Sequence, residues 1–164
     1  MTEICTGCGA EFAPETGPTH AYMLSSPACW RAYGEVLTRE YQDKTLFDAA
    51  HRFTVDAYAL QHPGLPDERR AYQSVRLHYA SLFLIFERGE SQARATRLLG
   101  QLAKSDHKPL PGLHAPFEIT VAEMTAIRID KHVDKARNWA RDSFDKWSIL
   151  KDETARLISG LEIH

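Results

Sequence analysis

The sequence predicts an all-α protein, a single domain in which residues 27–164 form a bundle of five or six helices behind an N-terminal cap formed by residues 1–26. Three observations lead to this prediction. Apolar residues recur at steps of three and four along several segments, which is the period of an amphipathic helix. No segment shows the strong alternation that is typical of a strand. The N-terminal stretch from Cys5 to Trp30 is polar, rich in Pro and Gly, and contains all three cysteines.

Composition restricts the class of protein. The 164 residues are enough to bury a core, and 43% hydrophobic and 26% charged residues are typical of globular proteins. A net charge of −2 gives no general attraction to nucleic acid or to a membrane. The odd number of cysteines argues against a secreted disulfide framework, and the N-terminus has no signal-peptide pattern. The longest apolar run, residues 82–86, is too short to span a bilayer. We therefore expect a soluble cytoplasmic protein.

The first helix is expected over residues 27–42. Ser26 followed by Pro27 is typical of an N-cap and a first helical residue. One apolar face of this helix is formed by four residues at helical spacing: Trp30, Tyr33, Leu37 and Tyr41. The only strand signal is weak and predicts at most a short hairpin around residues 21–24.

A second helix is expected over residues 45–61. Thr45 and Asp48 resemble a capping box at its start, with Asp in place of the usual Glu. Pro63 and Gly64 follow its end. Because the connection to the next helix is short, the second and third helices should pack antiparallel.

The third helix is expected between Asp67, a plausible N-cap, and Gly89, a plausible C-terminal stop. From residue 77 to 86 it is apolar nearly all round, which predicts that this helix is the buried centre of the fold. A fourth helix is expected over residues 91–104.

The last third of the chain begins with a long loop over residues 105–118, which contains three prolines and a glycine. Thr120 and Glu123 form a second capping box, so a short helix should begin there. A longer helix is expected over residues 130–147, with its apolar stripe in the core, and residues 151–161 could add one more.

The cap carries a pattern of metal-ligand residues. Cys5 and Cys8 form a C-x-x-C followed by Gly9, a spacing that lets a tight turn direct two sulfurs at one point. His20 and Cys29 complete a Cys3His set with the spacing C-x2-C-x11-H-x8-C. Thiolates and imidazole are the ligands of structural zinc sites, so the sequence predicts a zinc-knuckle-like cap that holds zinc or a similar soft metal.

Other interpretations of these residues stay open. His51 and His62 are rivals of His20 as fourth ligand. The C-x-x-C could be a redox pair or two free thiols, although no strand-then-helix pattern flanks it. Cys29 lies in the first turn of the first helix, where free backbone N–H groups stabilise a thiolate, so it could be a nucleophile instead of a ligand.

A second group of residues offers candidates for catalysis: His51, Asp56 and His78. His51 and His78 lie at equal distances from the turn between the second and third helices, and His78 is on the face expected to be buried. The two could line a polar pocket for a ligand or second metal, with Asp56 behind it. The simpler alternatives are a surface pair between Arg52 and Asp56, and a His78 satisfied by Tyr58, Asp56 or water.

Four segments of the chain carry a resemblance to a known family: CTGCG, GPTHAYMLSSPACW, VDAYALQHPG and WARDSFDKW. Together they are similar to segments of a bacterial family of small proteins known only as a domain of unknown function. The resemblance extends from about Cys5 to Trp147. It implies a cytoplasmic bacterial protein and implies no activity.

Two classes of function follow from these residues. In the first, which we favour, the protein is not an enzyme: zinc is structural, and the helices form a surface for a protein partner or a second copy of the chain. Nothing indicates a nucleic-acid or membrane partner. In the second, the bundle is a metal-dependent hydrolase or transferase.

The second class has one specific pattern in its favour. DinB-like bundle enzymes bind a divalent metal through three histidines on different helices, and this chain offers His51, His78 and His132 on three expected helices. It departs from that pattern because it lacks an H-x-x-x-H pair: the fourth residue after His132 is Ala136. The sequence therefore leaves open whether the protein is an enzyme.

Overall fold

The structure is a computed structural model that describes residues 1–113 and 116–162. Within these residues the chain forms seven α-helices, two short 3-10 helices and one two-stranded sheet, which confirms the all-α prediction. The elements in chain order are β1 (Glu3–Ile4), β2 (Glu11–Phe12), α1 (Pro27–Tyr41), α2 (Lys44–Gln61), α3 (Arg69–Phe86), α4 (Gln92–Leu102), α5 (Val121–Ala126), η1 (Ile129–Lys131), α6 (His132–Lys146), η2 (Ser148–Leu150) and α7 (Lys151–Glu162).

Side-chain caps start α1, α2, α4 and α5. The N-cap of α3 is Glu68 in place of the expected Asp67, and its side chain makes no cap hydrogen bond. Ser26 caps α1 as expected, and its hydroxyl accepts the N–H of Cys29. The capping box of Thr120 and Glu123 is present at the start of α5. At α2 the expectation was wrong in detail: the cap is Asp43 in place of Thr45, because the Asp43 carboxylate accepts the N–H at the third helical position.

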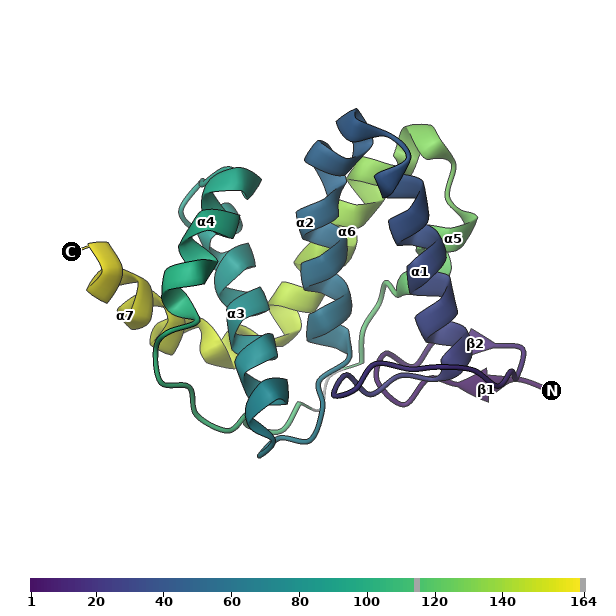
Figure 1. The fold of residues 1–164 in the computed structure, drawn as a ribbon, viewed down its shortest axis with the longest axis horizontal. Helices are drawn as coiled ribbons and strands as arrows, with labels where there is room; N and C mark the ends of the chain where they lie inside the picture. The colour runs from purple at the N-terminus through teal and green to yellow at the C-terminus, as the bar shows by residue number, and fades with distance from the viewer. Residues whose placement is uncertain (114–115, 163–164) are drawn as a thin grey trace.

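The centre of the fold is α2. It contacts α1, α3, α4 and α6, and its interface with α6 is the most extensive between any two helices in the described part of the chain. In Figure 1, α2 stands between α1 and α5 on one side and α3 and α4 on the other. The apolar half of α3 is buried, as expected, but α2 takes the central place because neighbours cover it on both sides.

The core between α2, α3 and α6 contains large aromatic side chains. Trp139 and Trp147 are buried, which confirms that the stripe on the sixth helix faces the core. The indole N–H of Trp147 donates to the carbonyl of Leu60 at 2.8 Å, so the end of α6 is bonded to the last turn of α2. Among the described helices, none is both long and apolar enough to cross a bilayer.

The N-terminal cap lies against the start of α1 and the end of α2 (Figure 1). Its strands β1 and β2 pair antiparallel, with Glu3 opposite Phe12 and Ile4 opposite Glu11. The hairpin expected around residues 21–24 is not formed there, and these residues are bends and irregular chain. The hairpin instead encloses the C-x-x-C turn, where backbone hydrogen bonds across the turn favour pairing of the flanking residues.

Candidate metal centre

The C-x-x-C turn is built by two backbone hydrogen bonds. The N–H of Cys5 donates to the carbonyl of Ala10 at 2.8 Å, and the N–H of Gly9 donates to the carbonyl of Cys5 at 2.9 Å. Gly9 has a φ of +81°, a conformation that is strained for any residue with a side chain. The turn thereby brings the buried side chains of Cys5 and Cys8 to the same side of the loop.

Gly7, between the two cysteines, packs directly on the end of α2. A Cβ atom at this position would lie 2.5 Å from Cδ2 of His62 and 3.0 Å from the carbonyl oxygen of Gln61. It would also lie 2.5 Å from the carbonyl oxygen of Leu24. The turn therefore reaches its position only because residue 7 has no side chain.

Cys29 is positioned by the first turn of α1. Its backbone N–H is bonded to the Ser26 cap, and its side chain is fully buried. The sulfur lies 3.8 Å from Sγ of Cys8 and 3.4 Å from the hydroxyl oxygen of Tyr58. A tyrosine hydroxyl at this distance can donate a hydrogen bond to a thiolate and so stabilise it as a ligand.

His62 is the residue that ends α2, and it is also fully buried. Its Nδ1 donates to the carbonyl of Tyr58 at 2.7 Å, and its ring stacks on the Tyr58 ring with centroids 3.8 Å apart. A proton on Nδ1 leaves the lone pair on Nε2, which lies 3.3 Å from Sγ of Cys29. This is the arrangement in which a histidine binds a metal: one nitrogen held by a backbone carbonyl and the other directed at the ion.

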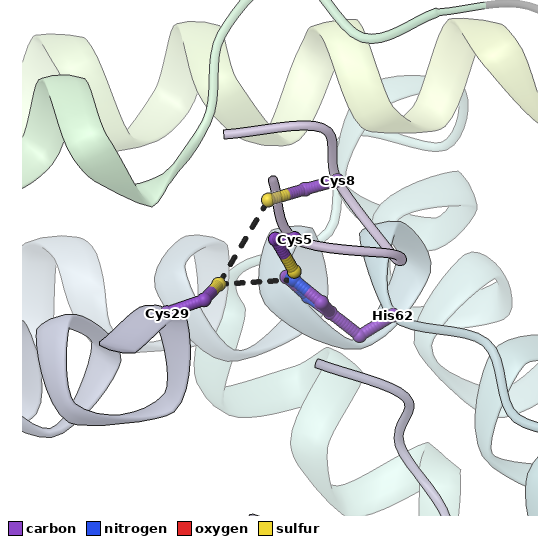
Figure 2. Close-up of side chains that lie close together, drawn as sticks. All are labelled: Cys5, Cys8, Cys29 and His62. Atoms are coloured by element: carbon purple, nitrogen blue, oxygen red, sulfur yellow. Dashed lines mark hydrogen bonds between the residues drawn. The ribbon is translucent and has the colours of Figure 1, made fainter. Parts of the chain in front are cut away.

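The four side chains Cys5, Cys8, Cys29 and His62 form one compact group, in which the ligand atoms all lie within 4.8 Å of one another. Figure 2 shows them converging from the turn, from α1 and from the end of α2. A tetrahedral zinc with Zn–S bonds of about 2.3 Å and a Zn–N bond of about 2.0 Å requires S···S separations of about 3.8 Å and S···N separations of about 3.5 Å. The observed 3.8 Å between Cys8 and Cys29 and 3.3 Å between Cys29 and His62 fit these values.

Ionisation of one of the three thiols opposes ionisation of the other two. The pKa of Cys29 is raised far above its usual range, because its contacts with Cys5 and then Cys8, and its burial, disfavour the thiolate. The pKa of Cys8 is raised to about 12: its contact with Cys29 acts to lower it, but Cys5 and burial outweigh that contact. Contacts with Cys29 and Cys8 hold the pKa of Cys5 far below its usual range. Three thiolates can coexist here only around a cation.

The structure brings together the three cysteines that the spacing predicts and places His62, one of the two rivals, beside them. His20 lies outside the group. Its Nδ1 accepts the backbone N–H groups of Tyr22 at 3.2 Å and Met23 at 3.3 Å, and its ring packs edge-on against Tyr22 and Trp30. His20 therefore stabilises the bend of the cap at residues 20–23, and the fourth position goes to His62 because α2 ends against the turn.

One sequence signal that was not used favours His62. The following Pro63-Gly64 ends α2 at this residue, and Tyr58 is one helical turn before it, where its carbonyl can hold the imidazole. Spacing alone does not show that this end of α2 meets the start of α1.

The candidate catalytic residues are not brought to one centre. His78 donates from Nδ1 to Asp56 at 2.7 Å, whereas His51 contacts Glu40 at 3.0 Å. His78 is thus satisfied by Asp56, one of the partners expected for it. Asp56 does pair with Arg52, at 2.6 Å, but it is completely buried, so the expectation of a surface pair was wrong.

The three histidines of the DinB-like pattern do not form one group: His51 and His132 share the carboxylate of Glu40, whereas His78 is bonded to Asp56. His132 is fully buried and contacts Glu40 at 2.7 Å, on the other carboxylate oxygen from His51. His78 belongs to the Asp56 pair. Within the described residues, the Cys3His group is the only cluster of three or more ligand side chains close enough to share an ion.

Comparison with known families gives one match. The model of a family of unknown function, DUF5946, matches residues 3–148, which is most of the chain. The chain belongs to this family. No curated protein and no solved structure matches it. Membership in DUF5946 agrees with the resemblance seen in the sequence and adds no activity.

In this DUF5946 member the segments that carry the resemblance meet at the candidate metal centre. CTGCG supplies the turn, GPTHAYMLSSPACW supplies Cys29 and its cap, and VDAYALQHPG supplies Tyr58 and His62. Gly64 in the third segment lies under the second: a Cβ there would be 2.0 Å from the carbonyl oxygen of Tyr22. WARDSFDKW contributes Trp147, which donates to Leu60 in the same last turn of α2.

Proposed function

We propose that the protein binds one zinc ion through Cys5, Cys8, Cys29 and His62 and that this zinc is structural. The observation that carries the proposal is the position of His62: its Nδ1 is held by a backbone carbonyl and its Nε2 faces the sulfurs. Three sulfurs and one imidazole nitrogen form a soft donor set that favours zinc over magnesium or calcium.

A structural role is supported by the number and burial of the donors. Four protein ligands fill a tetrahedral zinc and leave no position for substrate, in contrast to catalytic sites with three protein ligands and a water. All four side chains are buried. The centre also joins three parts of the chain: the N-terminal turn, the start of α1 and the end of α2.

The helical bundle then serves as an interaction surface for a protein partner or a second copy of the chain. Its described surface exposes several large apolar side chains, among them Tyr41, Leu65, Ile129 and Ile149. The alternative, a metal-dependent hydrolase or transferase, is less well supported because His51, His78 and His132 are each engaged by a buried carboxylate.

Metal analysis of purified protein tests the zinc proposal. We expect one zinc per chain in the wild type and in His20→Ala, and loss of bound zinc together with a lower unfolding temperature in His62→Ala. Structural zinc sites contribute on the order of 10 kcal/mol in isolated zinc peptides, so a chelator should unfold the cap. The pair of histidine variants is matched, since each removes one imidazole near the cap.

Two results would overturn the proposal. One is a His62→Ala protein that keeps its zinc while His20→Ala loses it, which would assign the fourth ligand to His20. The other is rapid reaction of all three thiols of the untreated protein with a thiol reagent, which would show that no metal holds them.

A further inference from the structure

A second site is indicated by two buried carboxylates, one on α1 and one on α2. The first is Glu40 of α1, which is completely buried. It accepts hydrogen bonds from His51 Nδ1 at 3.0 Å, from His132 Nε2 at 2.7 Å and from the Thr54 hydroxyl at 2.5 Å. Burial acts to raise the pKa of Glu40, but these hydrogen bonds outweigh it, so the pKa is lowered and the carboxylate is ionised.

The second carboxylate is Asp56 of α2. It accepts hydrogen bonds from Arg52 Nη2 at 2.6 Å, from His78 Nδ1 at 2.7 Å and from the Ser81 hydroxyl at 2.5 Å. Removing such a charge from water is costly, and every donor around it is needed to offset that cost. The two carboxylates therefore fix the orientation of the side chains bonded to them.

One side chain from each carboxylate group reaches the same cavity between α2 and α4, which we call the α2–α4 cavity. It has a volume of about 670 Å³, and its lining residues are Phe47, Asp48, His51, Arg52, Gln92, Ala93 and Thr96. This volume lies within the range of about 300–1,000 Å³ that is usual for small-molecule sites. The side chains of His51 and Arg52 are 21% and 16% exposed. Each is therefore fixed on one side by a buried carboxylate and is accessible from the cavity.

The charges at the wall are arranged to receive an anion. Glu40 has no Lys or Arg among its hydrogen-bond donors. His132 accepts an N–H of Arg39 at Nδ1, 3.2 Å away, and donates from Nε2 to Glu40. His51, whose Nδ1 is held by Glu40, is the hydrogen-bond donor of this group that lines the cavity.

Arg52 adds a cationic group. It binds Asp56 through Nε and Nη2, and Nη1 is not used in this pair. The acid at the rim, Asp48, is already paired with Lys44 at 2.7 Å. The apolar part of the wall is formed by Ala93 and by Phe47, whose ring stacks on that of His51 with centroids 4.1 Å apart.

We propose that the α2–α4 cavity binds a small organic anion, whose carboxylate or phosphate group contacts His51 and Arg52 and whose apolar part contacts Phe47 and Ala93. Glu40 and Asp56 act as positioning residues behind the two contacts. The site is separate from the metal centre: His51 and His62 are eleven residues apart on α2, which corresponds to about 16 Å. The proposal does not depend on which metal the cap binds.

The test uses four probes with the same aromatic ring, added to the metal-loaded protein and followed by amide NMR spectra. Benzoate and phenyl phosphate carry the oxyanion, benzamide is a neutral isostere of benzoate, and benzylamine is a cation. We expect one or both anions to shift the signals of residues 47–52 and 92–96. Because charge-assisted hydrogen bonds are lost with benzamide, benzamide should bind at least about tenfold more weakly than benzoate. The stronger of the two anions identifies the oxyanion that the cavity prefers.

Variants locate the binding. Ala93 is exposed at the cavity wall, so Ala93→Leu should fill the space and abolish the shifts while the unfolding temperature stays near that of the wild type. Ala126→Leu is the matched control, because Ala126 is also an exposed helical alanine and lines none of the cavities found among the described residues. His51→Gln removes the imidazole that Glu40 positions at the cavity wall, and it should weaken benzoate binding about tenfold.

Several outcomes would overturn the proposal. Equal shifts with benzoate and benzamide would show that no oxyanion contact exists, and a preference for benzylamine would assign the cavity to a cation. Unchanged benzoate binding in Ala93→Leu or His51→Gln would place the anion elsewhere. The probe comparison on wild-type protein decides the matter even if a variant fails to fold.

Discussion

A single methyl group at Gly7 tests the geometry of the metal centre. In Gly7→Ala the new Cβ would lie 2.5 Å from Cδ2 of His62, whereas carbon atoms in contact prefer about 3.5–4.0 Å. Two backbone carbonyl oxygens, of Leu24 and Gln61, block it on other sides. The C-x-x-C turn must therefore move away from the end of α2 by roughly 1 Å to restore ordinary contacts.

A displacement of this size matters because metal-ligand distances tolerate only about 0.2 Å. A turn that moves by about 1 Å carries the sulfurs of Cys5 and Cys8 away from Cys29 and His62. We expect zinc affinity to fall about 10- to 100-fold, as for other changes directly behind metal ligands. Crowding in a packed region adds a loss of about 1–3 kcal/mol in the free energy of unfolding.

The assay is competition for zinc with a chromophoric chelator, together with thermal unfolding. Gly17→Ala is the matched control, because the nearest atom to a Cβ there is Cβ of Pro27 at 4.0 Å, an ordinary contact. Gly9→Ala meets no atom within 4 Å but has a φ of +81°, so it should show only a backbone cost of about 1–2 kcal/mol. If Gly7→Ala binds zinc as tightly as Gly17→Ala, the turn does not pack on His62 and the geometry described above is refuted.

Three further predictions concern the core. Because the pKa of Glu40 is lowered in the folded state, the ionised carboxylate stabilises the fold fully above the unfolded-state pKa, and this stabilisation is lost as pH falls through the folded-state pKa. In acid unfolding experiments, Glu40→Gln should therefore lose less stability below about pH 4.5 than the wild type does. Asp56→Asn should lower the free energy of unfolding by about 3–5 kcal/mol, because it unpairs a buried network, whereas the exposed Asp48→Asn should change it by less than about 0.5 kcal/mol in denaturant titrations. Trp147→Phe leaves the buried carbonyl of Leu60 without its donor and should lower the free energy of unfolding by about 1–3 kcal/mol in the same assay. A decrease below about 0.5 kcal/mol would contradict the hydrogen bond between α6 and α2.

Local sequence patterns predicted most of the helices correctly. Ser26-Pro27 and the Thr120 capping box are signals within one turn of chain, and both act as expected. The shift from Thr45 to Asp43 at α2 is a choice between two neighbouring caps, which local rules do not separate well.

Long-range contacts explain what the sequence did not show. The spacing of Cys5, Cys8 and Cys29 predicted three members of the metal group because they lie within one stretch of chain. His62 joins them only through the packing of α2 against α1. Asp56 looked like a surface residue beside Arg52, since nothing in α2 itself reveals that His78 and Ser81 of α3 cover it.

The metal centre also has a consequence for biosynthesis. Cys29 is 21 residues after Cys8, and His62 is 33 residues after Cys29, so an ion bound by all four ligands closes long loops of the chain. Cross-links of this span restrict the unfolded chain by about 3–4 kcal/mol in the chain-entropy model. At about 5–20 residues per second, a ribosome needs several seconds to proceed from the first cysteines to the end of α2. The first residues to be synthesised can thus be fixed in place only after the end of α2 has emerged, and their thiols stay uncovered until then.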